Sequence, residues 1–495
     1  MLNTKTVKLL SVLLSAIIIL TAFSGCSGSD ADSYIYLNIA NKPVSLDPQT
    51  AQTDEELMIV RNIFEGLLRK DSKGKICPAV CETYSKNGLT YTFNLKKGLK
   101  WSNGENLTSR DFLFAFRRAV TPNVKSPFVN RLFKIKNAKA VYSGKLKASS
   151  LGVTAPDDYT LKIKLTSADK NFEDTLTTSL CMPCNEEFFK SCSGKYGLEA
   201  DSIVSNGSYS LTKWNPDDFG IRIRKNENYK GKYEAKNGAV FISSKTDEKT
   251  DTLFKKTSID VALVNNSDLD IVLKTGVEHI SFQNICWVMT VSPEYPEIVR
   301  KAFLSAVSYN IFKDKLSTGF SVAHSLYPKV LNPDQKVNGK GILTYDLKKS
   351  MSDFSYYISL TDEKEFPVAT LYYYDNPGII PAIRSILGHW QQNLCAFVNI
   401  TPAKNPEELK NELKNPNQQF AVFPVKATSQ NTNEYLLNFG KSGSDYVKIQ
   451  KELLADYTLV PLAFENTNIC YLKNVKNLYC DGENGYIDFS FAEKD

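Results

Sequence analysis

The sequence has little of what metal sites and nucleic-acid-binding surfaces are built from. Only three histidines occur in 495 residues, at positions 279, 324 and 389, too few and too scattered for a histidine-built metal site. Lys+Arg exceed Asp+Glu only slightly, 60 against 54, without long runs of one sign. Binding to nucleic acid requires a concentrated basic face. We therefore expect no metal, no cofactor and no nucleic-acid partner.

Catalytic motifs are also lacking. The sequence contains no GxSxG nucleophile elbow, no HExxH zinc motif and no Walker phosphate loop. Carboxylates are numerous, but no recognisable motif places two of them as an acid–base pair. We predict that the protein is not an enzyme.

Long apolar runs are confined to the N-terminus. Lys5 and Lys8 precede a charge-free apolar run over residues 9–22, a pattern typical of an export signal. Ser24 and Gly25 before Cys26 resemble a bacterial lipobox, which implies cleavage after residue 25 and diacylglycerol on the Cys26 thiol. Residues 26–33 are small and polar, as expected of a flexible tether. An uncleaved anchor is the alternative, and both hypotheses place the body at the membrane, outside the cytoplasm.

The remaining sequence has ordinary globular composition, 42% hydrophobic and 23% charged, which excludes wholesale disorder. Its length suggests about three domains. Helical and strand periodicities alternate along the chain, which favours an α/β architecture with more than one core. Helices are predicted over residues 55–68, 108–120, 298–307, 381–393 and 444–455, and strands over 34–40, 89–95, 160–165, 209–211, 220–224, 368–373, 420–425 and 459–464.

Glycines and aromatic residues mark one of these cores. Gly88, Gly98 and Gly104 lie between strand and helix patterns, where turns with positive φ are expected. Phe93, Trp101 and Phe112 are interpreted as core aromatics.

Several segments, in order along the chain, resemble bacterial extracellular solute-binding protein family 5, the oligopeptide- and dipeptide-binding subunits of ABC importers. They are VSLDP (44–48), FEGLLRKDSKGKICPAV (64–80), LTYTFNLKKGLKWSNGENLTSRDF (89–112), NGSYSLTKW (206–214) and VRKAFLSAVSYN (299–310). The resemblance implies a two-lobed, periplasmic-binding-protein-like α/β fold of type II, with an extra appended domain.

The resemblance also implies the domain boundaries and the mode of action. Residues 34–64, 206–282 and 469–495 would form a discontinuous lobe I, residues 65–205 an appended domain II, and residues 283–468 lobe III. Ligand would be enclosed between the lobes by hinge closure and delivered to an ABC permease and its ATPase. We expect a monomer that binds extracellular peptides. A lipid-anchored sensor, or a binder of a nickel complex, haem, opine or oligosaccharide, stays open as an alternative.

By position in the family, the ligand-binding residues would be Gln52, Thr53, Asp54, Phe128, Val425, Lys426 and Thr428. Peptide-binding relatives hold extended peptide by main-chain hydrogen bonds, as an added strand would be held. Many of them carry an Asp near the last three positions, which pairs with the ligand's α-amino group. The stretch 423–436 reads FPVKATSQNTNEYL and has no Asp at that point. Asp54 and Glu434 are the candidates to replace it.

Ten cysteines occur, and nine remain if Cys26 is lipidated. Cys181 and Cys184 form a CxxC motif, with Cys192 nearby as a third thiolate for zinc. Because the motif lies in a loop-rich stretch, a local disulfide or free thiols are favoured over redox or metal chemistry. Cys470 and Cys480 flank a predicted hairpin, which leaves a bridge between them open.

Overall fold

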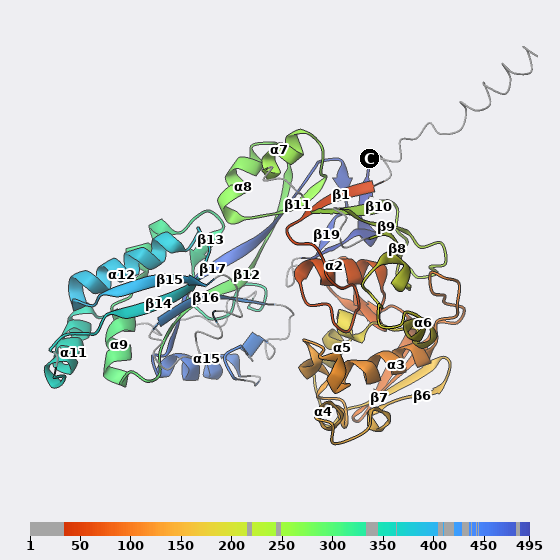
Figure 1. Ribbon diagram of the computed structural model, residues 1–495, viewed down its shortest axis with the longest axis horizontal. Coiled ribbons are helices and arrows are strands. Elements are labelled where there is room, and N and C mark those ends of the chain that lie inside the picture. The colour runs from red at the N-terminus through yellow and green to blue at the C-terminus, as the bar shows by residue number, and fades with distance from the viewer. Residues whose placement is uncertain are drawn as a thin grey trace, which may run out of the picture.

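The computed structural model describes two bodies joined by long strands (Figure 1). The described residues are 34–214, 220–243, 249–332, 345–362, 364–403, 409, 420–427, 435–436, 438–441, 443, 445–481 and 486–495. Cys26, Thr428 and Glu434 lie outside them. Within these ranges, no helix combines the length and the apolar character needed to cross a membrane.

One large mixed sheet runs through both bodies, in the order β15-β14-β16-β12-β17-β11-β1-β10-β9-β8, with β13 paired to β17. Its two longest strands pair antiparallel from Glu278 opposite Tyr471 to Thr290 opposite Leu459. They therefore connect lobe I to lobe III. The strands are β1 (Tyr34–Ile39), β8 (Tyr209–Lys213), β9 (Gly220–Lys225), β10 (Gly238–Ser243), β11 (Val261–Val264), β12 (Glu278–Val291), β13 (Phe320–Val322), β14 (Ala369–Tyr374), β15 (Val398–Ala403), β16 (Phe420–Lys426) and β17 (Leu459–Tyr471).

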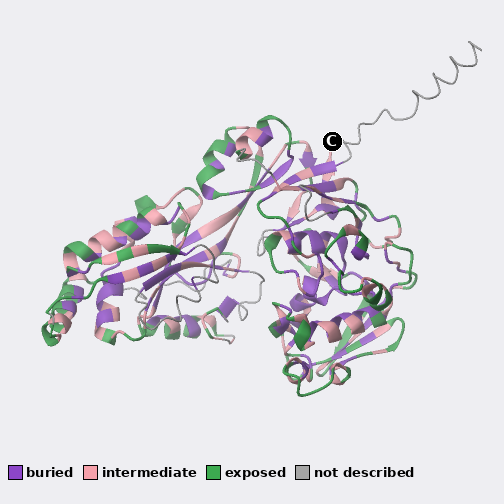
Figure 2. Ribbon diagram, viewed as in Figure 1, coloured by how far each residue is buried: buried purple, intermediate pink, exposed green. Residues whose placement is uncertain are grey.

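Lobe III has helices on both faces of its sheet. Alternate residues of β12 point to opposite faces, as the pleat requires. Trp287 and Met289 belong to one apolar cluster with residues of α9, α11 and α12, whereas Cys286 and Val288 belong to another with residues of α15. Figure 2 shows the lobe III end of β17 buried and much of α11 exposed. The helices are α9 (Glu297–Ser305), α10 (Tyr309–Phe312), α11 (Leu347–Leu360), α12 (Ile380–Leu394) and α15 (Tyr446–Ala455).

Lobe I and domain II share one continuous apolar core. Domain II contains a separate antiparallel sheet in the order β4-β5-β7-β6. The elements are α2 (Asp54–Ile63), β2 (Leu68–Lys70), β3 (Ile76–Pro78), β4 (Cys81–Asn87), β5 (Thr90–Leu95), α3 (Ser109–Ala119), α4 (Ala138–Tyr142), β6 (Val153–Asp157), β7 (Thr160–Lys164), α5 (Phe172–Thr175), α6 (Glu186–Ser191), α7 (Thr250–Lys255) and α8 (Asn266–Leu273). Two-residue strands β18 (Val475–Lys476), β19 (Tyr479–Cys480), β20 (Ile487–Asp488) and β21 (Glu493–Lys494) follow β17.

Most predicted elements are confirmed, and so is the α/β class. The helix expected over residues 55–68 is too long, because α2 ends at Ile63. Phe64 is extended, and the Asn206 side chain holds the next residue, accepting from the Glu65 N–H at 3.1 Å and donating to its carbonyl at 2.8 Å. This tertiary contact overrides the helical periodicity. The expected lobe boundaries at 282/283 and 468/469 fall inside β12 and β17.

Candidate functional site between the lobes

A buried carboxylate orders the loop that precedes α2. Glu56 is 3% exposed and accepts four backbone hydrogen bonds. Its Oε1 accepts from the N–H groups of Val44 and Ser45 at 2.9 and 3.0 Å, and its Oε2 from those of Gln52 and Thr53 at 2.9 and 3.1 Å. The Thr53 hydroxyl accepts from the Glu56 N–H at 3.3 Å, which completes a capping box. Glu56 therefore fixes both ends of the loop.

The VSLDP motif attaches this loop to domain II. Arg118 of α3 donates from Nη1 to Asp47 Oδ1 at 2.8 Å and to Gln49 Oε1 at 2.6 Å, and its Nη2 pairs with Asp47 Oδ2. A side chain at Gly197, which has φ of +73°, would lie 2.6 Å from the Asp47 nitrogen. Asp47 therefore pairs with a residue of the protein itself. This pair positions the residues that follow Asp47 in the chain.

Two of the predicted residues meet across the two lobes. Asp54 is the first residue of α2 in lobe I, and Lys426 is the last residue of β16 in lobe III. Lys426 Nζ lies 2.5 Å from Asp54 Oδ2. The side chains are 24% and 56% exposed, so water reaches the pair. Lys170 of domain II also reaches lobe III, with its Nζ 6.0 Å from the centre of the Tyr446 ring. The lobes thus make contact in this structure.

A small cavity lies beside this ion pair. Its volume is about 70 Å³, and Gln52, Asp54 and Phe128 all line it. The structure therefore brings together three of the residues predicted for the site. The remaining lining residues are Leu57, Arg61, Lys70, Arg131, Asp174, Thr177, Thr178, Ser179 and Tyr486.

The cavity wall is strongly charged. Lys70 Nζ lies 3.2 Å from Asp174 Oδ1 and 3.9 Å from Asp481 Oδ2. The Arg61 guanidinium stacks over the Tyr486 ring, 3.9 Å from its centre. Burial lowers the pKa of Arg61, and the nearby Asp481 carboxylate opposes that shift. The Arg131 guanidinium lies 4.7 Å from the centre of the Phe128 ring.

On the lobe III side, β16 ends with one edge open among the described residues. Its ladder with β12 runs from Phe420 to Lys426, but its ladder with β14 stops at Val422. The edge at residues 423–426 thus lies beyond the end of β14, with Lys426 at its tip. Such an edge can accept an extended strand by main-chain hydrogen bonds. The Val425 side chain is 5% exposed and packs in a core cluster with Cys286, so it is not available to a ligand.

A half-buried carboxylate lies on β17, where this strand crosses between the lobes. Glu465 accepts from Trp287 Nε1 at 2.6 Å, from Asn266 Nδ2 at 3.0 Å and from Asn376 Nδ2 at 3.2 Å. Burial raises its pKa, and these three donors oppose the shift. The donors come from α8, β12 and the loop after β14, so Glu465 ties the crossing strand to both lobes.

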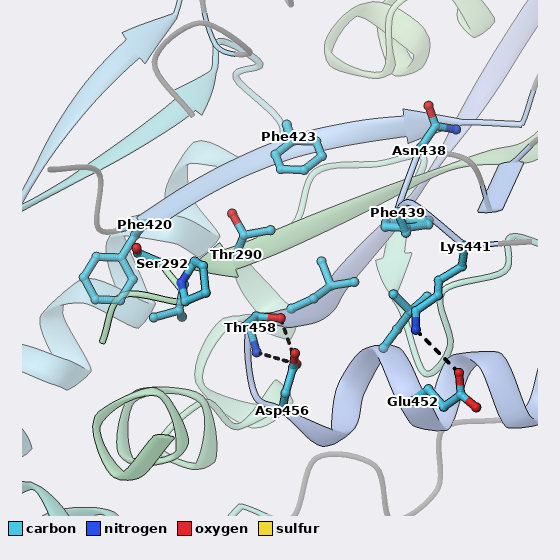
Figure 3. A pocket seen from close by; sticks show the side chains of 14 residues that line it. Thr290, Ser292, Phe420, Phe423, Asn438, Phe439, Lys441, Glu452, Asp456 and Thr458 are labelled. Carbon is cyan, nitrogen blue, oxygen red and sulfur yellow. Dashed lines mark hydrogen bonds and ion pairs between the residues drawn. The ribbon is translucent and has the colours of Figure 1, made fainter. Parts of the chain in front are cut away.

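A second, larger cavity of about 540 Å³ lies entirely within lobe III (Figure 3). Phe420 and Phe423 of β16 line one side, and Thr458 and Asp456 lie at the other. Lys441 pairs with Glu452 at 3.5 Å near its end. All its lining residues lie between positions 290 and 459, whereas those of the small cavity beside Asp54 come from lobe I and domain II, so the two cavities are separate.

A family model for bacterial extracellular solute-binding proteins, family 5 (middle), matches residues 75–446. The chain belongs to this family. It is a family of substrate-binding proteins rather than enzymes, which agrees with the lack of catalytic motifs.

Among sequence relatives, the dipeptide-binding protein DppE of Bacillus subtilis is 30% identical over 62% of this chain and 58% of DppE. The oligopeptide-binding protein OppA of the same organism is 31% identical over 50% of this chain and 42% of OppA. These alignments thus span about half the length of the curated relatives.

Two solved structures share the fold over nearly the whole chain. The pheromone receptor PrgZ superposes with a TM-score of 0.76 at 23% identity, covering 94% of this chain and 99% of PrgZ. Listeria monocytogenes OppA bound to peptide gives 0.75 at 21% identity, covering 93% and 99%. The two-lobed fold predicted for family 5 is confirmed.

The CxxC motif of this family 5 chain lacks the features of a redox or zinc site. Burial raises the pKa of both the Cys181 and Cys184 thiols to about 12, so neither is a ready thiolate. Every cysteine in the described part of the chain is free, including Cys470 and Cys480, so neither a local disulfide at the CxxC motif nor a Cys470–Cys480 bridge is present. No cluster of metal-ligating side chains occurs among the residues the structure describes.

Proposed function

We propose that this chain is the substrate-binding protein of an ABC importer and captures extracellular peptides in the cleft between lobe I and lobe III. One observation carries the proposal. β16 has an open edge at residues 423–426, and Lys426 at the end of that edge reaches Asp54 of lobe I at 2.5 Å. An extended peptide paired with that edge would lie against the loop and beside Phe128.

The proposed mechanism is hinge closure without bond chemistry. β12 and β17 connect the two lobes, and a small change in their backbone angles would rotate one lobe against the other. Ligand stabilises the closed form by the difference between its affinities for the closed and open forms. The polar contacts of Glu465 would set how far the strands bend. The closed form would then be the one that the permease recognises.

The names of relatives support a peptide as the ligand class. DppE is a dipeptide-binding protein, and the Listeria OppA structure holds a peptide. The membrane tether is a separate part of the proposal. We propose that Cys26 carries the lipid, that residues 1–25 are removed, and that the mature protein acts as a monomer on the outer surface of the membrane.

Native mass spectrometry of the purified chain tests the ligand class. Mass shifts corresponding to short peptides, released and sequenced after denaturation, are the expected result. Phe128→Ala and Gln52→Ala should each lower the affinity for a mixture of tri- to hexapeptides several-fold. Phe397→Ala, at a side chain 56% exposed outside the cavity, is the matched control. Release of a single species that is not a peptide would show that the protein binds another class of ligand.

A protein that releases nothing and binds no peptide mixture would instead support the sensor alternative. The lipid anchor is tested independently by labelling cells with a fatty-acid analogue. The wild-type chain should take up the label and Cys26→Ser should not. Equal labelling of both would contradict the proposed anchor.

A further inference from the structure

A groove of about 490 Å³ runs along one side of α3 in domain II. It shares no lining residue with the cavity beside Asp54. Most of its lining residues follow one another at intervals of three and four along α3 and just beyond its end, which places them on one side of the helix. They are Arg110, Leu113, Phe114, Arg117, Arg118 and Thr121. The remaining lining residues are Val124, Ala148, Glu186 and Phe189.

The two sides of α3 differ in burial. The core side consists of four fully buried residues, Phe112, Ala115, Phe116 and Ala119. The apolar side chains that line the groove are only half-buried, and they are Leu113, Phe114, Val124 and Phe189. The rings of Phe114 and Phe189 lie 5.5 Å apart, so α6 contributes to the wall of the groove. A concave surface lined by half-buried apolar side chains is typical of a binding site.

Arg117 lies within this row and has no partner of its own. Its Nε atom is buried without a hydrogen-bond partner, and no carboxylate in the described part of the chain pairs with its guanidinium. The two other arginines of the groove are paired. Arg118 donates to Asp47 at 2.8 Å, and Arg110 lies 3.0 Å from Asp158. Because a buried donor without a partner costs free energy, Arg117 marks a place for an acceptor, and a carboxylate suits a guanidinium well.

The segment that forms most of the groove carries charge of one sign. Residues 112–156 contain nine Lys and Arg and no Asp or Glu, an excess that the balanced composition of the whole chain conceals. Lys125 and Lys147, which are neighbours of lining residues in the chain, are exposed. Glu186, the one carboxylate among the described lining residues, lies 2.7 Å from Lys190. The potential of the groove is therefore positive and attracts an acidic partner.

The shape of the groove indicates what kind of acidic partner fits. α3 has 11 residues, so the groove follows a helix about 16 Å long. An amphipathic helix packs in such a groove by placing apolar side chains, three and four residues apart, between the side chains that line it. We propose that this groove binds an acidic amphipathic helix of a partner protein. Its apolar side chains would contact Leu113, Phe114 and Phe189, and one of its carboxylates would pair with Arg117.

Two synthetic 18-residue peptides test this proposal by fluorescence anisotropy with the purified chain. Both carry Leu residues three and four positions apart on an Ala-rich background. One has Glu at the flanking positions, and the other has Lys at the same positions. We expect the Glu peptide to bind at least tenfold more tightly than the Lys peptide, and its affinity to fall as the salt concentration rises. Arg117→Gln should weaken binding of the Glu peptide about tenfold, because the carboxylate loses its charged partner.

A matched variant separates the groove from the general charge of domain II. Lys162→Gln also removes one positive charge, but from an exposed side chain of β7 outside the groove, and it should leave both affinities unchanged. Equal binding of the Glu and Lys peptides, or equal losses in the two variants, would overturn the proposal. Arg117-dependent binding to phosphatidylglycerol vesicles that is tighter than binding to the Glu peptide would also overturn it, because the partner would then be a lipid surface.

The proposal is independent of peptide capture between the lobes. Arg117→Gln should keep the wild-type affinity for a mixture of tri- to hexapeptides, since Arg117 does not line the cavity beside Asp54. A loss of that affinity together with the loss of Glu-peptide binding would show that the substitution acts on the whole domain, and would overturn the assignment of the groove.

Discussion

Lys426 and Asp54, 372 positions apart in the chain, form an ion pair that joins lobe III to the first turn of α2. The structure thus shows the lobes in contact through side chains of opposite charge. Because Asp54 is more than half exposed, the pair is weak enough for a ligand to rearrange.

A double-mutant cycle measures this pair. We expect Lys426→Gln and Asp54→Asn, singly and combined, to give a coupling of about 0.2–1 kcal/mol in the free energy of unfolding. Ligand-free Lys426→Gln should also show a larger radius of gyration in X-ray scattering, since the lobes lose a contact. A coupling near zero together with an unchanged radius would show that the pair does not hold the lobes.

The Glu56 carboxylate should matter much more. Glu56→Ala leaves four backbone N–H groups without their acceptor, so we expect a loss of at least about 2 kcal/mol in the free energy of unfolding. The same variant should weaken peptide binding, because Gln52 and Asp54 lose their fixed positions. Glu55→Ala, whose side chain accepts from Asn41 alone among the described residues, is the control and should cost about 0.5 kcal/mol or less. Similar losses in both variants would contradict the role given to Glu56.

Asp111 should give domain II a pH-dependent stability. Burial raises the pKa of this carboxyl from 3.8 to about 6, although the Thr108 N–H donates to it at 2.7 Å. Between these two values the folded state binds more protons than the unfolded state, so the Asp111 contribution to stability falls as the pH rises. Relative to wild type, Asp111→Asn should therefore gain stability as the pH rises from about 4 to about 6. Thermal denaturation of both proteins across this range is the measurement. If the stabilities of the two proteins changed in parallel with pH, the pKa of Asp111 would not be shifted.

The cysteines should differ sharply in reactivity. At pH 8 a thiol with a pKa near 12 is thiolate in only about one molecule in ten thousand. Cys181 and Cys184 should therefore resist iodoacetamide in the folded protein, while the exposed Cys395 reacts first. Peptide mapping after timed alkylation shows the order in which the cysteines react. Early modification of Cys184 would revive a redox role for the CxxC motif.

Local patterns sufficed for much of the fold. Gly88, Gly98 and Gly104 have φ of +58°, +73° and +88°, as their turn positions predicted. Phe93, Trp101 and Phe112 are fully buried, as expected. β12 was missed because Cys286 to Met289 are buried on both faces, so the strand shows no polar–apolar alternation there.

Only part of the site could be predicted from the sequence. Gln52, Asp54 and Phe128 were placed by family position and line one cavity. Glu56 carries a detectable signal, since Thr53 three residues before it forms a capping-box pattern. Tyr486, Arg131 and Glu465 carry no such signal, because only tertiary folding brings them to the cleft.

Hydrogen–deuterium exchange of the chain with and without a tri- to hexapeptide mixture tests the central claim most directly. Peptide bound as an added strand between the lobes should slow exchange of the Lys426 backbone amide, since Ala427 donates to β12 and strand residues alternate, and of the amides at residues 52–54, in the same sample. Protection confined to the lobe III cavity around Phe420 and Phe439, or no protection under conditions where peptide is bound, would contradict binding in the interlobe cleft.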